Sequence, residues 1–330
     1  MKITKIFIYF FLTFFLNINN SFSDDFNEWL ISFNKFALEE GISKETLNKT
    51  MLNVKFLPKV IEYDRYQPEF YEDTKTYISK RTSDNKVNKG ISLYKENNLL
   101  INKIEKKYNI EKELLLSLMG IETNFGTYLG KMDILSSLAT LSFDKRRSEF
   151  FTRELIIVLK LIDNGVIDSD VLFGSWAGAF GNFQFMPSTI NNYAIDYNKD
   201  KFIDLKSYED SFASAANYLN KLGWKKNYPC YYPVKLTKNI PKKLLNTSAK
   251  KIKNKKKFKN VKKYITTNIV VDDNSLVGII TPDSDIVENS NIYEPAYIVF
   301  SNYELILKWN RSLRFALAVC TLKDKFKNEL

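Results

Sequence analysis

The chain has 330 residues, which is enough for one large domain with additions or for two modest domains. It contains no histidine, which excludes catalysis by Ser-His or Cys-His pairs and metal sites built on histidine. Its chemistry must therefore use carboxylates, lysine, tyrosine, hydroxyls or backbone groups. The formal net charge of +11 favours an anionic partner.

The first 23 residues have the pattern of a secretory signal peptide. Lys2 and Lys5 precede an apolar stretch at residues 6–16, and cleavage is expected after Ser23. The stretch is shorter than the ~20 residues that span a bilayer. We therefore expect a periplasmic protein, with retention of the segment as a membrane anchor as the alternative.

Residues 24–90 are expected to form an N-terminal helical region. FNEWLISFNKFALEEG predicts a helix that stops at Gly41, and Ser43 is the expected cap of the next one. Residues 84–89 are interpreted as a short polar connection. Residues 91–226 continue the helical periodicity to Gly223 and are expected to form the main helical core.

Residues 227–300 are expected to form a small, basic, strand-rich subdomain, because prolines and β-branched runs such as YITTNIVV replace the helical pattern. Within it, residues 249–264 are rich in lysine and contain no acid. We interpret this stretch locally as a solvated loop that could steer the protein to an anionic wall polymer or a membrane surface. Residues 301–330 form the C-terminal segment, whose helix at about 312–326 should pack back on the body.

The stretch GIETNFGTYLG places one carboxylate, Glu122, at the end of an apolar run and just before a glycine turn. A half-buried carboxyl group has a raised pKa and can donate a proton near neutral pH. The alternative is an ordinary helix-edge glutamate held by a neighbour. A second stretch, GSWAGAFGNFQFMPST, combines glycines with the neutral hydrogen-bonding side chains of Ser175 and Gln184, and Pro187 is expected to start a helix.

In order and spacing, ETNFG, SWAGAFGNFQFMPST and NYAIDYNKDKFIDL resemble the lytic murein transglycosylase B family. The resemblance runs from about Asp64 to Gly223 and resumes between Tyr303 and Val319. It implies a mainly α (α+β) protein with a lysozyme-like catalytic domain that cuts the bond between N-acetylmuramic acid and N-acetylglucosamine in peptidoglycan.

The resemblance also implies a mechanism. Glu122 would act first as general acid on the glycosidic oxygen and then as general base on the C6 hydroxyl of muramic acid, leaving a 1,6-anhydro end without using water. Ordinary glycosidases need a second carboxylate. The nearby acids, Asp133, Asp144 and Glu149, have no spacing that marks one of them as that partner.

Further residues fall on family positions in the substrate groove. Ser175 and Gln184 would bind the sugar or its acetamido group, and Asn310 would contribute from the C-terminal segment. Arg146 and Arg147 would face the anionic lactyl or peptide part of the wall, with a solvated helix face as their alternative. Phe315 stands where a tyrosine is expected, which removes one hydrogen bond to substrate.

The stretch DYNKDKFIDLKSYED resembles a calcium loop, and we expect a structural ion rather than a catalytic one, with no cofactor needed for the chemistry. Lys201 replaces the usual glycine at position six and Ser207 the usual glutamate at position twelve; a solvated polar turn is the alternative. The expected ligands are Asp196, Asn198, Asp200, the Phe202 carbonyl, Asp204 and, as the family's later closing acid, Asp210.

The leading hypothesis is thus an exported peptidoglycan lytic transglycosylase. A hydrolytic muramidase and an inactive peptidoglycan-binding protein are the alternatives. Glycan strands are the expected partner, nucleic acid is not expected, and a monomer is the default. The sequence permits a disulfide between Cys230 and Cys320 but does not decide whether it forms.

Overall fold

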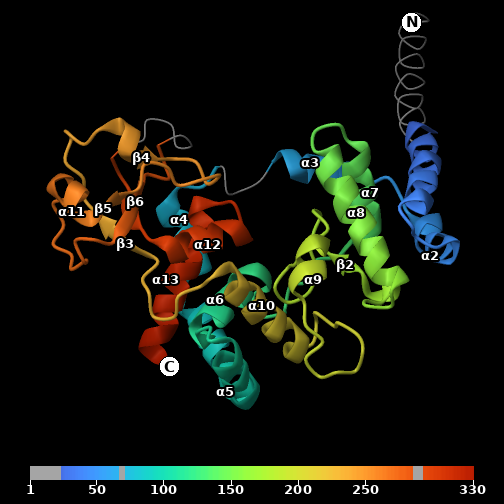
Figure 1. Cartoon of the computed structure of the whole chain (residues 1–330), viewed down its shortest axis with the longest axis horizontal. Coiled ribbons are helices and arrows are strands. Elements are labelled where there is room, and N and C mark those ends of the chain that lie inside the picture. Colours follow the sequence, from blue (N-terminus) through green and yellow to red (C-terminus); the bar gives the residue numbers. More distant parts are fainter. Residues whose placement is uncertain (1–23, 67–70, 285–292) are drawn as a thin grey trace, which may run out of the picture. The chain divides into compact units, whose positions relative to one another are not determined.

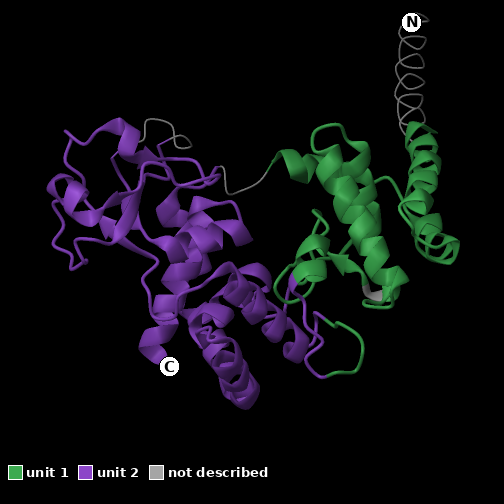
Figure 2. Ribbon diagram, in the orientation of Figure 1, with its two compact units in different colours: residues 1–66, 129–192, 199–204 green, residues 67–128, 193–198, 205–330 purple. Residues whose placement is uncertain are grey.

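The computed structural model describes residues 24–66, 71–284 and 293–330, so the expected signal segment at residues 1–23 lies outside the described part. The chain forms two compact units whose segments alternate along the sequence (Figure 2). Unit 1 comprises residues 1–66, 129–192 and 199–204. Unit 2 comprises residues 67–128, 193–198 and 205–330.

Unit 1 is helical apart from one short antiparallel pair of strands, β1 with β2. Helices α7 and α8 form its main packed pair (Figure 1). In chain order its elements are a helix at residues 24–39, α2 (Lys44–Thr50), η1 (Met51–Asn53), α3 (Pro58–Arg65), β1 (Met132–Asp133), α7 (Ile134–Phe143), α8 (Ser148–Asp163), η3 (Ser169–Val171), β2 (Phe173–Gly174) and α9 (Pro187–Tyr193).

Local signals set several helix ends in unit 1 as predicted. The first helix stops before Gly41, and the Ser43 hydroxyl accepts a hydrogen bond from the Thr46 amide as the cap of α2. Pro187 begins α9. An aromatic cluster anchors the first helix, with the ring centroid of Phe26 5.5 Å from that of Phe143.

Unit 2 contains the remaining long helices: α4 (Thr74–Arg81), α5 (Asp84–Tyr108), α6 (Lys112–Thr123), α10 (Tyr208–Leu222), α12 (Ser301–Trp309) and α13 (Leu313–Glu329). Helix α13 packs against α6 and α4, and α10 packs against α5. Gly223 ends α10 with a φ of 88°. The polar connection expected at residues 84–89 is wrong, because these residues form the first turns of α5, where polar side chains occupy an exposed helical face.

The strand-rich module, residues 228–300, also belongs to unit 2. Its sheet has the order β3-β7-β6-β4, antiparallel except for the parallel pair β4 and β6, with β5 added to β6. The strands are β3 (Tyr231–Val234), β4 (Leu245–Asn246), β5 (Lys256–Lys257), β6 (Leu276–Ile280) and β7 (Ala296–Val299), accompanied by η4 (Lys242–Leu244), α11 (Phe258–Val261) and η5 (Lys262–Tyr264). The run YITTNIVV supplies only an isolated bridge at Ile265 and no strand.

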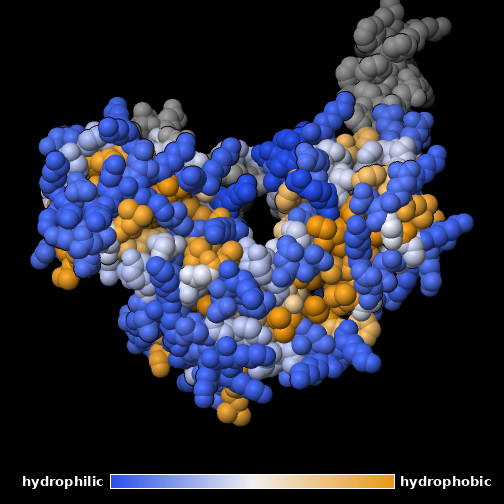
Figure 3. Space-filling model, viewed as in Figure 1, coloured by the Kyte–Doolittle hydropathy of each residue, from blue (hydrophilic) through white to orange (hydrophobic). Residues whose placement is uncertain are grey.

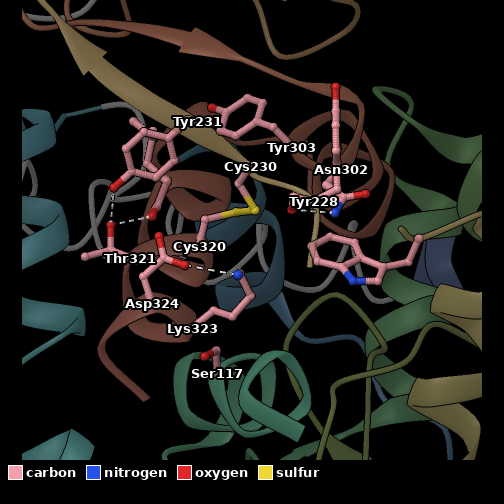
Figure 4. The surroundings of a disulfide bond; sticks show 12 residues. Ser117, Tyr228, Cys230, Tyr231, Asn302, Tyr303, Cys320, Thr321, Lys323 and Asp324 are labelled. Carbon is pink, nitrogen blue, oxygen red and sulfur yellow. Dashed lines mark hydrogen bonds and ion pairs between the residues drawn. A yellow bond between two sulfur atoms is a disulfide. The ribbon is translucent and has the colours of Figure 1, made fainter. Parts of the chain in front are cut away.

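A disulfide joins Cys230, directly before β3, to Cys320 in α13 (Figure 4). Both cysteines are buried. Beside the disulfide, the hydroxyls of Tyr231 and Thr321 lie 2.6 Å apart in a second contact between the same two elements (Figure 4). The module is therefore fastened to the helical part of unit 2 by both a covalent bond and a hydrogen bond.

The architecture confirms the expected fold class, a mainly α protein with a small strand-rich part. None of the helices in the described ranges combines the length and the apolar character needed to cross a bilayer.

Candidate active site

Glu122 lies in the last turn of α6 and is half-buried. The chain leaves the helix through three consecutive left-handed residues, Asn124, Phe125 and Gly126, with φ values of 50°, 62° and 76°. Left-handed backbone costs energy for residues other than glycine and persists only where the surroundings enforce it. The predicted general acid thus precedes a strained turn.

Packing beneath the turn enforces this conformation. The buried Phe125 ring covers Gly120, where an added Cβ would lie 2.6 Å from Phe125 Cζ. Phe125 also meets Phe326 of α13 edge to face, at 6.4 Å between centroids. The small residue at position 120 therefore allows the turn after Glu122 to fold onto its own helix.

Two lysines of α5 hold the same turn by its polar groups. Lys86 Nζ donates to the Gly120 carbonyl at 2.6 Å and to Asn124 Oδ1 at 3.2 Å, and Lys89 Nζ donates to Thr127 Oγ1 at 2.9 Å. Burial, and then the charges of Lys89 and Arg81, lower the pKa of Lys86. The first turns of α5 therefore cap the C-terminus of α6 and fix the loop that follows Glu122.

Trp309, the last residue of α12, contacts Glu122 directly. Its indole Nε1 donates a hydrogen bond of 3.0 Å to Glu122 Oε1. The Trp309 ring packs on Tyr218 at 5.2 Å between centroids, and Tyr218 packs on Tyr193 at 4.5 Å. Burial, followed by Tyr193, raises the pKa of Tyr218 to about 12. The sequence analysis did not identify Trp309 or Tyr218.

Asn310 follows Trp309 and ends α12, where its backbone amide donates to the Ile306 carbonyl. It is half-buried, and its side-chain amide makes no hydrogen bond within the described residues. Phe315 lies in the first turn of α13 and is 3% exposed, so it belongs to the core of unit 2. Glu122, Trp309 and Asn310 thus share one unit.

Ser175, Gln184, Arg146 and Arg147 belong to unit 1. The Ser175 hydroxyl accepts from the Ala179 amide at 3.1 Å, while the Ser175 amide donates to the Ala179 carbonyl at 2.8 Å. Ser175 therefore closes the turn that contains Gly178 and keeps its own hydroxyl proton for another acceptor.

Gln184 is a second strained position, with a φ of 49°. Its side-chain nitrogen donates to the carbonyls of Leu129 at 3.1 Å and Gly181 at 2.9 Å. Because both amide protons are used, the side-chain oxygen is the group that the residue offers as an acceptor.

Arg146 and Arg147 converge on Asp64, whose carboxylate is 1% exposed. Arg146 Nε donates to Asp64 Oδ2 at 2.7 Å and its Nη2 to the Asp64 carbonyl at 2.6 Å, while Arg147 pairs with Oδ1. The side chains of Arg146 and Arg147 remain 46% and 40% exposed, so one buried carboxylate orients both cations while each stays partly open to solvent.

The three other acids that follow Glu122 in sequence have structural partners in unit 1. Asp133 caps α7 by accepting from the Ser136 amide at 2.7 Å. Asp144 pairs with Arg65 at 2.9 Å, and Glu149 pairs with Arg153 at 2.9 Å. Each of these carboxylates thus already has a hydrogen-bonding or ion-pair partner.

The expected calcium loop retains one conformational feature of such loops. Lys201 has a φ of 80°, the left-handed geometry for which glycine is usual at position six. Asp200 Oδ1 accepts from the Phe202 amide, and the buried Asp210 accepts from the Tyr197 amide at 2.8 Å. Over residues 24–66, 71–284 and 293–330, no three acids, cysteines or histidines gather closely enough to form a metal cluster.

The chain matches the family model described as the transglycosylase SLT domain over residues 25–324. It is 36% identical over 151 residues to the membrane-bound lytic murein transglycosylase B of Escherichia coli, a match that covers 46% of this chain and only 42% of that relative.

Solved structures are similar over most of the chain. SltB3 from Pseudomonas aeruginosa, solved in complex with NAG-NAM-pentapeptide, has a TM-score of 0.80 and 29% identity and covers 92% of this chain and 79% of its own. Slt35 of Escherichia coli, solved in complex with calcium, has a TM-score of 0.76 and 24% identity, and the match covers 93% of this chain and 94% of Slt35. At this identity the similarity supports the fold alone. The chain therefore belongs to the family of the transglycosylase SLT domain.

Proposed function

We propose that the protein is a peptidoglycan lytic transglycosylase whose general acid and base is Glu122. The proton of Glu122 passes to the glycosidic oxygen as the bond from C1 of N-acetylmuramic acid breaks. The carboxylate then takes the proton of the C6 hydroxyl as that oxygen bonds to C1. The products are a free 4-hydroxyl on N-acetylglucosamine and a 1,6-anhydro ring, and the glutamic acid is regenerated.

The observation that carries this proposal is the hydrogen bond from Trp309 to Glu122 at the strained end of α6. A general acid must be held in one orientation toward the atom that it protonates. The indole donor and the left-handed turn supply this orientation from two sides. Membership of the transglycosylase SLT family, and the glycan-peptide ligand of SltB3, support the same substrate class.

The structural partners of Asp133, Asp144 and Glu149 favour the non-hydrolytic reaction over hydrolysis. A hydrolase would need a second carboxylate about 5 to 9.5 Å from the acid, and these three carboxylates already cap a helix or pair with arginines. The C6 hydroxyl of the substrate replaces the nucleophile that such a carboxylate would provide or activate.

Polar side chains at the predicted substrate positions are assigned to substrate binding. The Gln184 oxygen and the Ser175 hydroxyl suit the N–H and carbonyl of an acetamido group, and the Asn310 amide suits a sugar hydroxyl. The exposed edges of Arg146 and Arg147 suit the carboxylate of the lactyl or peptide moiety.

Mass spectrometry of the soluble products of digested peptidoglycan tests the proposal. Wild-type protein should release muropeptides lighter by one water than hydrolytic products, and Glu122→Gln should release none. Reducing-end products would instead identify a hydrolase. Absence of products from both proteins would leave a wall-binding role.

We propose a structural calcium ion in the loop that runs from Asp196 to Asp210. The order of oxygen ligands and the left-handed Lys201 support it, whereas the lysine ammonium near the ion opposes it. When bound, the ion would hold the loop and take no part in the chemical step. Calcium should raise the melting temperature of wild-type protein and not that of Asp200→Asn. Equal melting temperatures of wild-type protein with calcium and with a chelator would contradict a calcium site.

Export is proposed from the leader pattern of residues 1–23 together with the Cys230–Cys320 disulfide, because such bonds persist in oxidising compartments. Fractionation of cells that express the full chain, with N-terminal sequencing, tests both export and cleavage after Ser23.

A further inference from the structure

The lysine segment, residues 249–264, is a folded surface of the strand-rich module rather than the solvated loop that its composition indicates. Ile252, Phe258 and Val261 are buried in or against the module core. The segment includes β5, which pairs with β6, followed directly by α11 and η5. An added Cβ at Gly278 of β6 would lie 2.3 Å from Ile252 Cγ2, so the segment packs tightly on the sheet.

Because Ile252, Phe258 and Val261 are buried, most lysines of the segment are exposed to solvent. Of the lysines in the segment, Lys255 pairs with Glu304 and Lys262 with Asp273, and no other forms an ion pair within the described residues. The exposed lysines of the segment and of the preceding turn are Lys242, Lys243, Lys250, Lys251, Lys253, Lys256, Lys257, Lys259, Lys262 and Lys263.

Acidic side chains do little to balance this charge. Residues 227–284 contain three acids, of which Asp283 is buried in an ion pair with Arg314. Asp272 and Asp273 remain, and Asp273 already pairs with Lys262. On the face seen in Figure 3, the surface over the module is accordingly mostly hydrophilic, with isolated hydrophobic patches. The module therefore presents a positive surface held in a fixed arrangement.

Exposed aliphatic side chains accompany the lysines. Leu276, the register partner of Lys257 across the β5–β6 pair, is 52% exposed. Val270, in the chain between η5 and β6, is 96% exposed. Aliphatic side chains beside cations are typical of surfaces that lie on a lipid headgroup layer, where the cations meet anionic lipids and the apolar groups enter the interface.

We propose that the lysine segment, with Leu276, binds the surface of an anionic lipid bilayer. Its cations are all lysines, which act as mobile point charges toward a diffuse array of headgroups, whereas arginine would favour bidentate recognition of single phosphates or carboxylates. Unpaired nucleic acid stacks on exposed aromatic rings, but in this segment Phe258 is buried, and Tyr264 is half-buried with the Lys263 ammonium over its ring. This inference does not depend on the proposed catalytic function.

Sedimentation with lipid vesicles tests the inference in the full chain. One vesicle preparation contains phosphatidylglycerol and phosphatidylcholine, and the other contains phosphatidylcholine alone. The test variant changes Lys256, Lys257, Lys259 and Lys263 to glutamine. Its matched control removes the same charge from exposed lysines elsewhere, namely Lys35, Lys44, Lys59 and Lys75. Because residues 1–23 are the same in every protein, their contribution cancels between variants.

We expect wild-type protein to prefer the anionic vesicles, and we expect the test variant to lose at least about tenfold in partitioning to them. Partitioning of the control variant to the anionic vesicles should change less than about twofold. Leu276→Ser should weaken binding to the anionic vesicles while leaving the melting temperature unchanged. Equal binding to both vesicle types, or equal loss in test and control variants, would overturn the inference. Lysine-dependent binding to peptidoglycan sacculi with none to vesicles would also overturn it, in favour of a wall polymer.

Discussion

The indole nitrogen of Trp309 lies 3.0 Å from Oε1 of Glu122, and the two residues are 187 positions apart in the chain. Trp309 comes from the end of α12, and Glu122 comes from the end of α6. Two helix C-termini therefore meet at the proposed general acid. The Trp309 ring packs on Tyr218, which in turn packs on Tyr193.

Replacement of Trp309 by phenylalanine removes the donor and keeps an aromatic ring. An N–H donated to a carboxylate favours its charged form, so loss of the donor favours the protonated form. An enzyme that depends on a general acid loses activity as pH rises through the pKa of that acid, and this loss should occur at higher pH in Trp309→Phe than in wild type. Because the carboxyl group is also less well oriented, kcat should fall at least about tenfold.

The pH profile separates this role from simple packing. Tyr218→Phe removes a hydroxyl from the stack but keeps both rings and the Trp309 donor, and it should leave the alkaline limb of the profile in place. If Trp309→Phe lowers kcat equally at every pH, the indole supports the site by packing and not through its hydrogen bond.

Gly120 allows the turn after Glu122 to close, and Gly120→Ala should disturb it. Alanine normally favours a helix over glycine by about 0.5 to 1 kcal/mol. Here its Cβ would lie 2.6 Å from Phe125 Cζ, and the clash should outweigh the helix gain, with a net loss of about 1 to 3 kcal/mol in the free energy of unfolding.

A second substitution identifies the cause. Phe125→Leu shortens the side chain that the new methyl group meets, so the double variant should recover part of the stability and activity lost in Gly120→Ala. Chemical denaturation of the four proteins gives the coupling energy. Additive effects would show that Phe125 is not the group that excludes a side chain at position 120.

The sequence predicted the features that depend on neighbouring residues. Ser43, Pro187 and Gly223 act on backbone groups within one turn, so their caps could be located without knowledge of the fold. The position of Glu122 at the end of an apolar run predicted a half-buried carboxyl group, and the structure confirms its burial.

Features that depend on tertiary contacts could not be found in this way. No spacing relates Trp309 to Glu122, since their contact exists only once α12 and α6 are both folded. Lys86 and Lys89 were interpreted as part of a polar connection, yet each reaches across to the turn after α6. In the lysine segment a signal was present but missed, because Ile252, Phe258 and Val261 interrupt the charges at positions that turn inward.

Removal of the disulfide should destabilise unit 2. The bond closes a loop of 90 residues, and constraint of a loop of that size in the unfolded chain corresponds to about 4.6 kcal/mol in the chain-entropy model. The double variant Cys230→Ser, Cys320→Ser should melt at a lower temperature than wild type, and a reductant should lower the melting temperature of wild type only. Equal melting of all samples with and without reductant would contradict a stabilising role for the bond.

Buried tyrosines of unit 2 should make the fold sensitive to alkali. Burial is the main cause that raises the pKa of Tyr218 to about 12 and holds those of Tyr297 and Tyr303 well above 10.0, with smaller contributions from neighbouring tyrosines. These tyrosines ionise near pH 10.0 in the unfolded chain but stay protonated at that pH in the folded chain. Their contribution to the free energy of unfolding is therefore fully present well below pH 10 and is lost as pH rises from 10 to 12. Each such tyrosine lowers the free energy of unfolding by at most about 1.4 kcal/mol per pH unit.

Chemical denaturation at pH 8, 10 and 11 should therefore give a free energy of unfolding that declines much more steeply over the upper interval than over the lower one. Tyr297→Phe provides the control, because it keeps the ring that packs on Tyr231 at 5.3 Å and removes one titrating hydroxyl. Its decline with pH should be shallower than that of wild type. An identical slope in both proteins would mean that Tyr297 ionises in the folded chain at its ordinary pKa, and that burial does not protect it.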